Sequence, residues 1–289
     1  MTSPKNKVKT VSKSAVATSK TVEATAPTVE MQAVKVNKTK VKKVMPRDLG
    51  LIKFVGQGGV SSLPQLHQVF TKLSDHPTTQ ERTCRERLAQ LEKTGYLQSQ
   101  FVDVRRRGEL VFTMTEEGAK LFSKVERKRF IMSLPNHSEL KQQLVGQDTR
   151  LVLEESLAKE GYRLVDWQHE RELRSRQKQT GKQQAGGGSS PPVPTSAYRG
   201  SSRKKKKTEM DIGDARAVFV NSQGKDLTLE IEVDGQYYGK MLKNKLTYFA
   251  NSGKETIWAT DSTKRAAHVK ELIDSEEFGP AKNIRVLVV

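Results

Sequence analysis

Apolar positions recur at helical spacing in three successive stretches that begin at Pro46. The pattern is clearest in the third stretch, where Cys84, Leu88 and Leu91 share one face of a helix and charged residues point away from it. Gly95 follows as a C-terminal stop. The pattern therefore predicts three consecutive amphipathic helices, with Cys84 packed in their core.

The residues around the third helix extend this order of elements. Thr78 or Thr79 is expected to cap the helix. After it, YLQSQFVDV and ELVFTMT alternate as two strands, and the turn RRRG between them carries Arg105, Arg106 and Arg107. Three helices followed by a basic hairpin is the layout of a winged helix-turn-helix.

The second half of the chain mixes helical and alternating patterns. A long helical stretch ends at Gly161 and precedes the strand YRLVDW and the charged helix QHERELRSRQ. Two further strands follow, GDARAVFV and LTLEIEVDG. A helix from Lys240 to Phe249, the strand TIWAT, a helix from Lys264 to Ile273 and the strand NIRVLVV come last. This order predicts a domain of the α+β or α/β class.

Two stretches are too poor in apolar residues to join a core. The first, residues 1–45, is rich in Lys, Thr, Ser and Val, and the second, residues 177–208, is dense in Gly, Ser and Pro and ends in a basic run. We expect a disordered basic arm over 1–45 and a winged-helix DNA-binding domain over 46–133. The second domain is expected over 134–289, with a flexible insertion at 177–208.

Composition narrows the class of partner. The chain of 289 residues has a formal net charge of +18 and is 35% hydrophobic. Such a charge predicts a polyanionic partner, with double-stranded DNA first and an anionic membrane surface as the rival. No apolar run approaches the roughly 20 residues of a spanning helix, and no signal peptide is evident, so we expect a cytoplasmic protein without membrane insertion. A single cysteine excludes an internal disulfide.

The third helix and the hairpin turn supply the DNA-contacting residues. Thr79 and Arg82 are the expected base readers at the start of the helix, with Thr83 on its flank. Arg85 and the three arginines of the turn are expected to bind phosphates. A winged helix that contacts only protein is the alternative.

The stretch LTLEIEVDG alternates strictly, with its apolar residues on one face and Glu230, Glu232 and Asp234 on the other. Carboxylates in one row raise one another's pKa, so a cation is expected among them. A divalent metal is the usual cation, and Asp214 on the preceding strand and the lysines of the following helix strengthen that interpretation. An edge strand with its acidic face in water is the alternative.

This arrangement of acids resembles the core of the PD-(D/E)xK nucleases. Gly213 stands where the motif has its proline, and Glu232 or Asp234 stands where it has its lysine. The resemblance implies a restriction-endonuclease-like αβββαβ core that uses Mg²⁺ or Mn²⁺, with the lysine's role passing to Lys243 or, as we favour, Lys245. The implied catalytic residues are Asp214, Glu232 and Lys245, and the implied metal ligands are Asp214, Glu230, Glu232 and Asp234.

Together, RDLGLIKFV, NHSELKQQLVGQ, GYRLVDWQHERELR and the GDA…LEIEVD…KLTYF block resemble the replication-relaxation family, in particular the MOB-C mobilisation relaxases. The resemblance implies a site- and strand-specific nick at a plasmid origin of transfer, with other relaxosome proteins as partners. The alternative is a DNA-binding accessory protein or replication regulator whose nuclease core has decayed. Tyr237 and Tyr238 are alternative nucleophiles, and Tyr248 is expected to pack in the core. The five histidines are scattered along the sequence.

Overall fold

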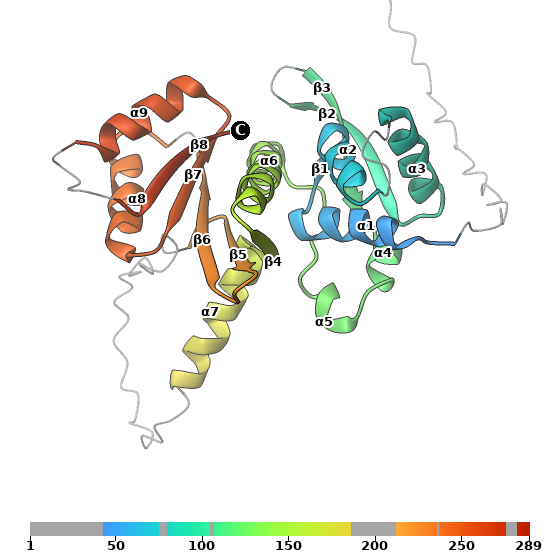
Figure 1. Cartoon of the computed structure of the whole chain (residues 1–289), viewed down its shortest axis with the longest axis horizontal. Coiled ribbons are helices and arrows are strands. Elements are labelled where there is room, and N and C mark those ends of the chain that lie inside the picture. The colour runs from blue at the N-terminus through green and yellow to red at the C-terminus, as the bar shows by residue number, and fades with distance from the viewer. Residues whose placement is uncertain (1–42, 75–79, 105–106, 186–211, 236, 276–281) are drawn as a thin grey trace, which may run out of the picture. The chain divides into compact units, whose positions relative to one another are not determined.

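The computed structural model describes residues 43–74, 80–104, 107–185, 212–235, 237–275 and 282–289 (Figure 1). The predicted arm lies outside the described residues up to residue 42. Most of the predicted insertion also lies outside them, whereas its first residues belong to a helix that continues to Ala185. The division into domains at residue 134 stays a prediction.

The N-terminal described part contains helices and a small antiparallel sheet of strand order β1-β3-β2. The elements are α1 (Pro46–Gly58), β1 (Ser61–Ser62), α2 (Leu63–Lys72), α3 (Glu81–Lys93), β2 (Leu97–Val104) and β3 (Arg107–Met114). Val104 pairs with Arg107, so β3 begins two residues before the predicted strand. The prediction was wrong there because Arg107 and Gly108 pair with β2 as part of the ladder.

Helices α1, α2 and α3 pack through one apolar core that includes Leu51, Phe70, Cys84 and Leu88, so the predicted burial of Cys84 is confirmed. An ion pair inside this part joins α1 to α3, because Arg87 Nε donates to Asp48 Oδ1 at 2.7 Å. The side chain of Asp48 is fully buried. Such a buried pair stabilises the packing only while both partners are present.

Two local predictions for this part were wrong. Helix α3 begins at Glu81 with Gln80 as its N-cap, so neither Thr78 nor Thr79 caps it, and both threonines lie outside the described residues. The stretch EEGAKLFSKVERKRF after β3 is predicted from the sequence as one closing helix, but it forms α4 (Glu116–Lys120) and α5 (Lys124–Arg127). The break follows from Ser123, whose Oγ accepts a hydrogen bond from the Glu126 backbone and starts a new helix.

The C-terminal described part is built on a five-stranded sheet of order β4-β5-β6-β7-β8. The pairs β4–β5 and β5–β6 are antiparallel, whereas the pairs β6–β7 and β7–β8 are parallel. The elements are α6 (His137–Lys159), β4 (Tyr162–His169), α7 (Glu170–Ala185), β5 (Ala215–Asn221), β6 (Asp226–Val233), α8 (Gly239–Ser252), β7 (Thr256–Thr260), α9 (Thr263–Ile273) and β8 (Ile284–Val288).

Helices cover both faces of this sheet (Figure 1). One face packs Leu229 and Ile231 of β6 against Val145 and Leu153 of α6. The opposite face packs Trp258 of β7 against α8 and α9. Because β6 lies in the middle of the sheet, its acidic row is covered and does not face water, which rules out the edge-strand alternative. The mixed α+β class predicted from the sequence is confirmed.

Among the residues that the structure describes, none of the helices combines the length and apolar character needed to span a membrane.

Candidate functional site

Strands β5 and β6 bring the two central acids together. Ala215 pairs with Ile231, so the next residues of the antiparallel pair, Asp214 and Glu232, are cross-strand neighbours on the same face. Asp214 Oδ2 accepts a hydrogen bond from the Val233 backbone at 2.8 Å, which fixes its carboxylate beside Glu232. Glu232 itself is 0% exposed. The sequence predicted that these two acids converge, and the structure places them so.

There is also a structural reason why Gly213 stands where the PD-(D/E)xK motif has proline. Gly213 precedes Asp214 and lies against the backbone of β6. A Cβ at this position would lie 2.7 Å from the carbonyl oxygen of Ile231, closer than real Cβ contacts. Any residue larger than glycine, proline included, would therefore push β5 away from β6.

Lys245 reaches the acids from α8, as the sequence predicted. Its Nζ contacts Glu232 Oε1 and donates to Tyr237 Oη at 2.9 Å. The ammonium also lies 4.2 Å from the centroid of the Tyr237 ring, a cation–π distance. Tyr237 in turn packs edge-on against Trp258, with ring centroids 6.3 Å apart. Lys245 is thus positioned by the Glu232 carboxylate and by the Tyr237 ring, and that ring is positioned in turn by Trp258.

Close packing at Gly235 allows this arrangement. A Cβ there would lie 2.6 Å from Gln142 Nε2 and 3.0 Å from the Tyr237 ring. The absence of a side chain at Gly235 therefore leaves room for the Tyr237 ring beside it.

Burial dominates the electrostatics of the cluster. Burial raises the pKa of Glu232 from 4.5 to about 8, and the Asp214 carboxylate acts in the same direction. Burial also raises the pKa of Asp214 to about 6, against the effect of Lys245. For Tyr237, burial and the Glu232 carboxylate raise the pKa to about 12, so the phenol stays protonated. Burial lowers the pKa of Lys245, but Glu232 and Tyr237 together more than offset this and the net shift is upward.

A cavity of about 650 Å³ opens onto this cluster. Its lining includes Asp214, Tyr237 and Lys245, and also Arg171 and Arg174 of α7. Arg174 is paired with Glu170 of its own helix at 2.5 Å. Neither arginine was predicted from the sequence to belong to the site. The charged run HERELRSR was the available signal, but only the turn from β4 into α7 shows that this run borders the acids.

Two of the four predicted metal ligands are engaged elsewhere. Glu230 pairs with Arg216 at 2.6 Å and with Lys254 at 3.3 Å. Asp234 forms a bidentate pair with Arg265, at 2.5 and 3.2 Å. Within the described ranges no three or more His, Cys, Asp or Glu side chains are grouped closely enough to hold an ion. The structure therefore assembles Asp214 and Glu232 but not the full predicted set.

The donor set at Asp214 and Glu232 nevertheless suits a hard divalent cation. Both side chains offer carboxylate oxygens, which Mg²⁺ and Mn²⁺ prefer, and Mg²⁺ commonly uses only one or two carboxylates together with water and substrate phosphate. Glu232 Oε2 is buried and has no hydrogen-bond partner among the described residues. An unpaired buried carboxylate oxygen is costly, so a ligand for it is expected.

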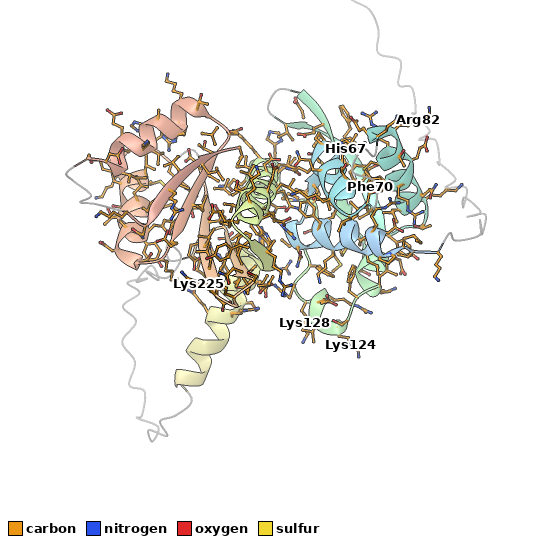
Figure 2. All side chains as sticks on the ribbon, in the orientation of Figure 1. His67, Phe70, Arg82, Lys124, Lys128 and Lys225 are labelled. Atoms are coloured by element: carbon orange, nitrogen blue, oxygen red, sulfur yellow. The ribbon has the colours of Figure 1, made fainter. Side chains whose placement is uncertain are left out.

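The predicted DNA-contacting residues of α3 lie on its exposed face. Arg82, Thr83 and Arg85 are exposed, and Figure 2 shows Arg82 on the outer side of α3. Arg82 pairs with Glu86 at 2.9 Å and Arg85 pairs with Glu81 at 2.6 Å, both at i,i+4 spacing. Exposed pairs of this kind are weak, so DNA phosphates can replace them. Thr79, Arg105 and Arg106 lie outside the described residues, and only the backbone of Arg107 is described.

The remaining tyrosines and histidines take different positions. Tyr248 packs edge-on against Phe249 at 5.3 Å, in agreement with the predicted core role. Tyr238 is 70% exposed. His169 lines the cavity, and burial lowers its pKa. Its position at the end of β4 was not predicted as part of the site.

The raised pKa values predict how stability depends on pH in the metal-free protein. A carboxyl whose folded pKa is raised contributes stability below its unfolded pKa, and this is lost as pH rises through the folded value. For Glu232 the window runs from 4.5 to about 8. The free energy of unfolding, measured with urea in chelator, should therefore fall across this window by a few kcal/mol, as an order of magnitude.

In a Glu232→Gln variant the free energy of unfolding should fall less with rising pH. The fall should end near pH 6, because only Asp214 still titrates there. Glu155 is exposed on α6, so a Glu155→Gln variant should keep the wild-type slope. Equal slopes for the wild type and Glu232→Gln would contradict the burial of an ionisable Glu232.

The chain is similar in sequence to a known protein family. A family model described as replication-relaxation matches residues 52–234, more than half of the chain. The match includes Asp214 and Glu232 and ends before Tyr237 and Lys245. Neither curated proteins nor solved structures gave a match.

Proposed function

The chain belongs to the replication-relaxation family, which suggests a role in plasmid replication or mobilisation, and on this premise we propose that it is a relaxase of the MOB-C class. The proposed activity is a metal-dependent, site- and strand-specific nick at a plasmid origin of transfer, made in the cytoplasm. Its substrate is double-stranded DNA, and its partners are other mobilisation proteins.

The observation that carries this proposal is the cluster of Asp214, Glu232 and Lys245 at the cavity. A nuclease core without a lysine at the motif position can work only if another lysine reaches the acids, and otherwise it has decayed. Lys245 reaches Glu232. The order α6-β4-α7-β5-β6-α8-β7 also contains the αβββαβ elements of a restriction-endonuclease-like core, with α7 added between β4 and β5.

In this proposal Asp214 and Glu232 hold Mg²⁺ or Mn²⁺. When bound, such an ion supplies charge neutralisation at the phosphate and activation of water. Lys245 keeps its proton because its pKa is raised, so its ammonium stabilises negative charge that develops on the phosphate oxygens. Arg171 lines the same cavity and orients the phosphodiester through charge-assisted hydrogen bonds.

Nicking by the wild-type protein tests this directly. Supercoiled plasmid carrying the origin is incubated with protein in Mg²⁺, in Mn²⁺ and in chelator. Open circles that form only with metal, at one site on one strand, support the proposal. Tight DNA binding without any nick would instead identify a DNA-binding regulator with an inactive core.

We propose that the N-terminal helices and hairpin are a winged helix that selects the origin through α3. The order of elements and the exposed basic start of α3 support this. Changing Arg82 to alanine is expected to weaken binding to origin DNA roughly tenfold, with a smaller effect on unrelated DNA, because a base reader has been removed. The matched control is Lys93→Ala at the other end of the same helix. Fluorescence anisotropy at fixed salt measures the DNA affinity of both variants. If Arg82→Ala lost affinity equally for origin and unrelated DNA, Arg82 would contact only phosphate.

A further inference from the structure

An exposed aromatic residue lies next to the proposed catalytic cluster. Tyr238 follows Tyr237 directly and has an extended backbone, with φ −127° and ψ 154°. Neighbouring side chains on an extended backbone point in opposite directions. Tyr237 accordingly lines the cavity beside Lys245, whereas the Tyr238 side chain is 70% exposed.

The Tyr238 ring is held in place by a fixed cation. The guanidinium of Arg265 lies 5.1 Å from the ring centroid, a cation–π contact. Arg265 is itself fixed, since it forms the bidentate pair with Asp234 and also donates to the backbone carbonyl of Tyr237. Its side chain is only 14% exposed. This contact favours one orientation of the ring.

The surroundings of Tyr238 are apolar and cationic. Met241, three residues further along α8, is 56% exposed. Lys240 is exposed in the first turn of α8, and Lys264 is exposed in the first turn of α9 beside Arg265. Neither first turn contains an acid. An aromatic face with adjacent methionine and lysines complements a nucleobase attached to a phosphate backbone.

We propose that Tyr238 is a stacking platform for an unpaired base of single-stranded DNA that flanks the phosphate held at Asp214 and Glu232. This inference rests on the proposed function and deepens it, because it requires the DNA next to the cleavage position to be unpaired. A paired base presents its faces to its stacked neighbours and not to protein, so a flat exposed ring selects single-stranded over duplex DNA. The bound strand would lie with its phosphates near Lys240 and Lys264.

Binding measurements in chelator test the platform without any nicking. The probe is a labelled single-stranded oligonucleotide of the origin, and its duplex is the comparison. Stacking on an aromatic side chain contributes about 1–3 kcal/mol per base, so Tyr238→Ala should weaken single-strand affinity at least about fivefold. Affinity for the duplex should change less than about twofold, and Tyr238→Phe should bind like the wild type because the ring remains.

Val165 gives a control because it is an exposed apolar residue on β4, outside the proposed winged helix. Val165→Ala should leave single-strand affinity unchanged. A 5-iodouracil oligonucleotide should crosslink to Tyr238 on irradiation, as mapped by mass spectrometry. Unchanged single-strand affinity of a folded Tyr238→Ala variant would overturn the platform, whether or not the wild type nicks. Loss of single-strand binding in a protein that never nicks would leave the platform standing and reject the nuclease.

Discussion

A Glu232→Gln variant is expected to nick supercoiled plasmid at least about a hundredfold more slowly than the wild type, while its affinity for origin DNA stays within about twofold. Glutamine keeps the volume of the side chain and removes the negative charge. The reason for the loss is that Glu232, which is fully buried and contacts Lys245, is one of the two carboxylates proposed to hold the metal ion. Initial rates of open-circle formation in saturating Mg²⁺ or Mn²⁺ measure the effect.

Glu230→Gln is the matched control for this experiment. Glu230 belongs to the same acidic row and is also buried, but its carboxylate is held by Arg216 and Lys254. The control should therefore keep a nicking rate within about tenfold of the wild type, well above that of Glu232→Gln. If both variants lost activity equally, the whole row would act together, as the sequence alone implied. If Glu232→Gln nicked like the wild type, the proposed site would be wrong.

Replacing Lys245 with methionine is expected to remove nicking and to lower stability. The change leaves Glu232 buried without its cation, and removing one partner of a buried ion pair typically costs about 3–5 kcal/mol. Glu232 can avoid part of this cost by taking up a proton, so the loss of stability should be larger at pH 9 than at pH 6. Urea unfolding followed by circular dichroism at the two pH values measures it.

The double variant Glu232→Gln, Lys245→Met separates stability from chemistry. With both charges removed, no ion is left buried and unpaired at these two positions, so most of the lost stability should return while nicking stays absent. Lys254→Met is the matched lysine control. Its ammonium is half exposed and 3.3 Å from Glu230, so the change should cost less than about 1 kcal/mol. A Lys245→Met variant with normal nicking would show that the ion pair is purely structural.

The arrangement of cations explains why one carboxylate differs from its neighbours. Glu230 and Asp234 each meet an arginine, and an arginine holds a carboxylate in a fixed geometry through several donors. Glu232 meets a lysine, a single point charge, and its second oxygen has no partner within the described part of the chain. An open oxygen beside the Asp214 carboxylate is what distinguishes Glu232 chemically.

Periodicity in the sequence was enough to predict most of the elements. The alternation in LTLEIEVDG predicts the strand and the shared face of its acids, because successive side chains of a strand point to opposite faces. The helix carrying Lys245 was predicted from its apolar spacing, and α8 covers those residues. Boundaries were less well predicted, as at α3 and at the Ser123 break, because caps depend on local hydrogen bonds.

By itself the sequence determined the row of acids, the strand before it with Asp214 and the helix after it, since these depend on residues close together in the chain. Only the tertiary structure decided which cation meets which acid. Arg216 comes from β5, Lys254 from the loop before β7 and Arg265 from α9, and no spacing in the sequence predicts such contacts. The same is true of Tyr237 against Trp258 and of α7 at the cavity. Packing of distant elements therefore turned four equivalent acids into one pair at a cavity and two acids held by arginines.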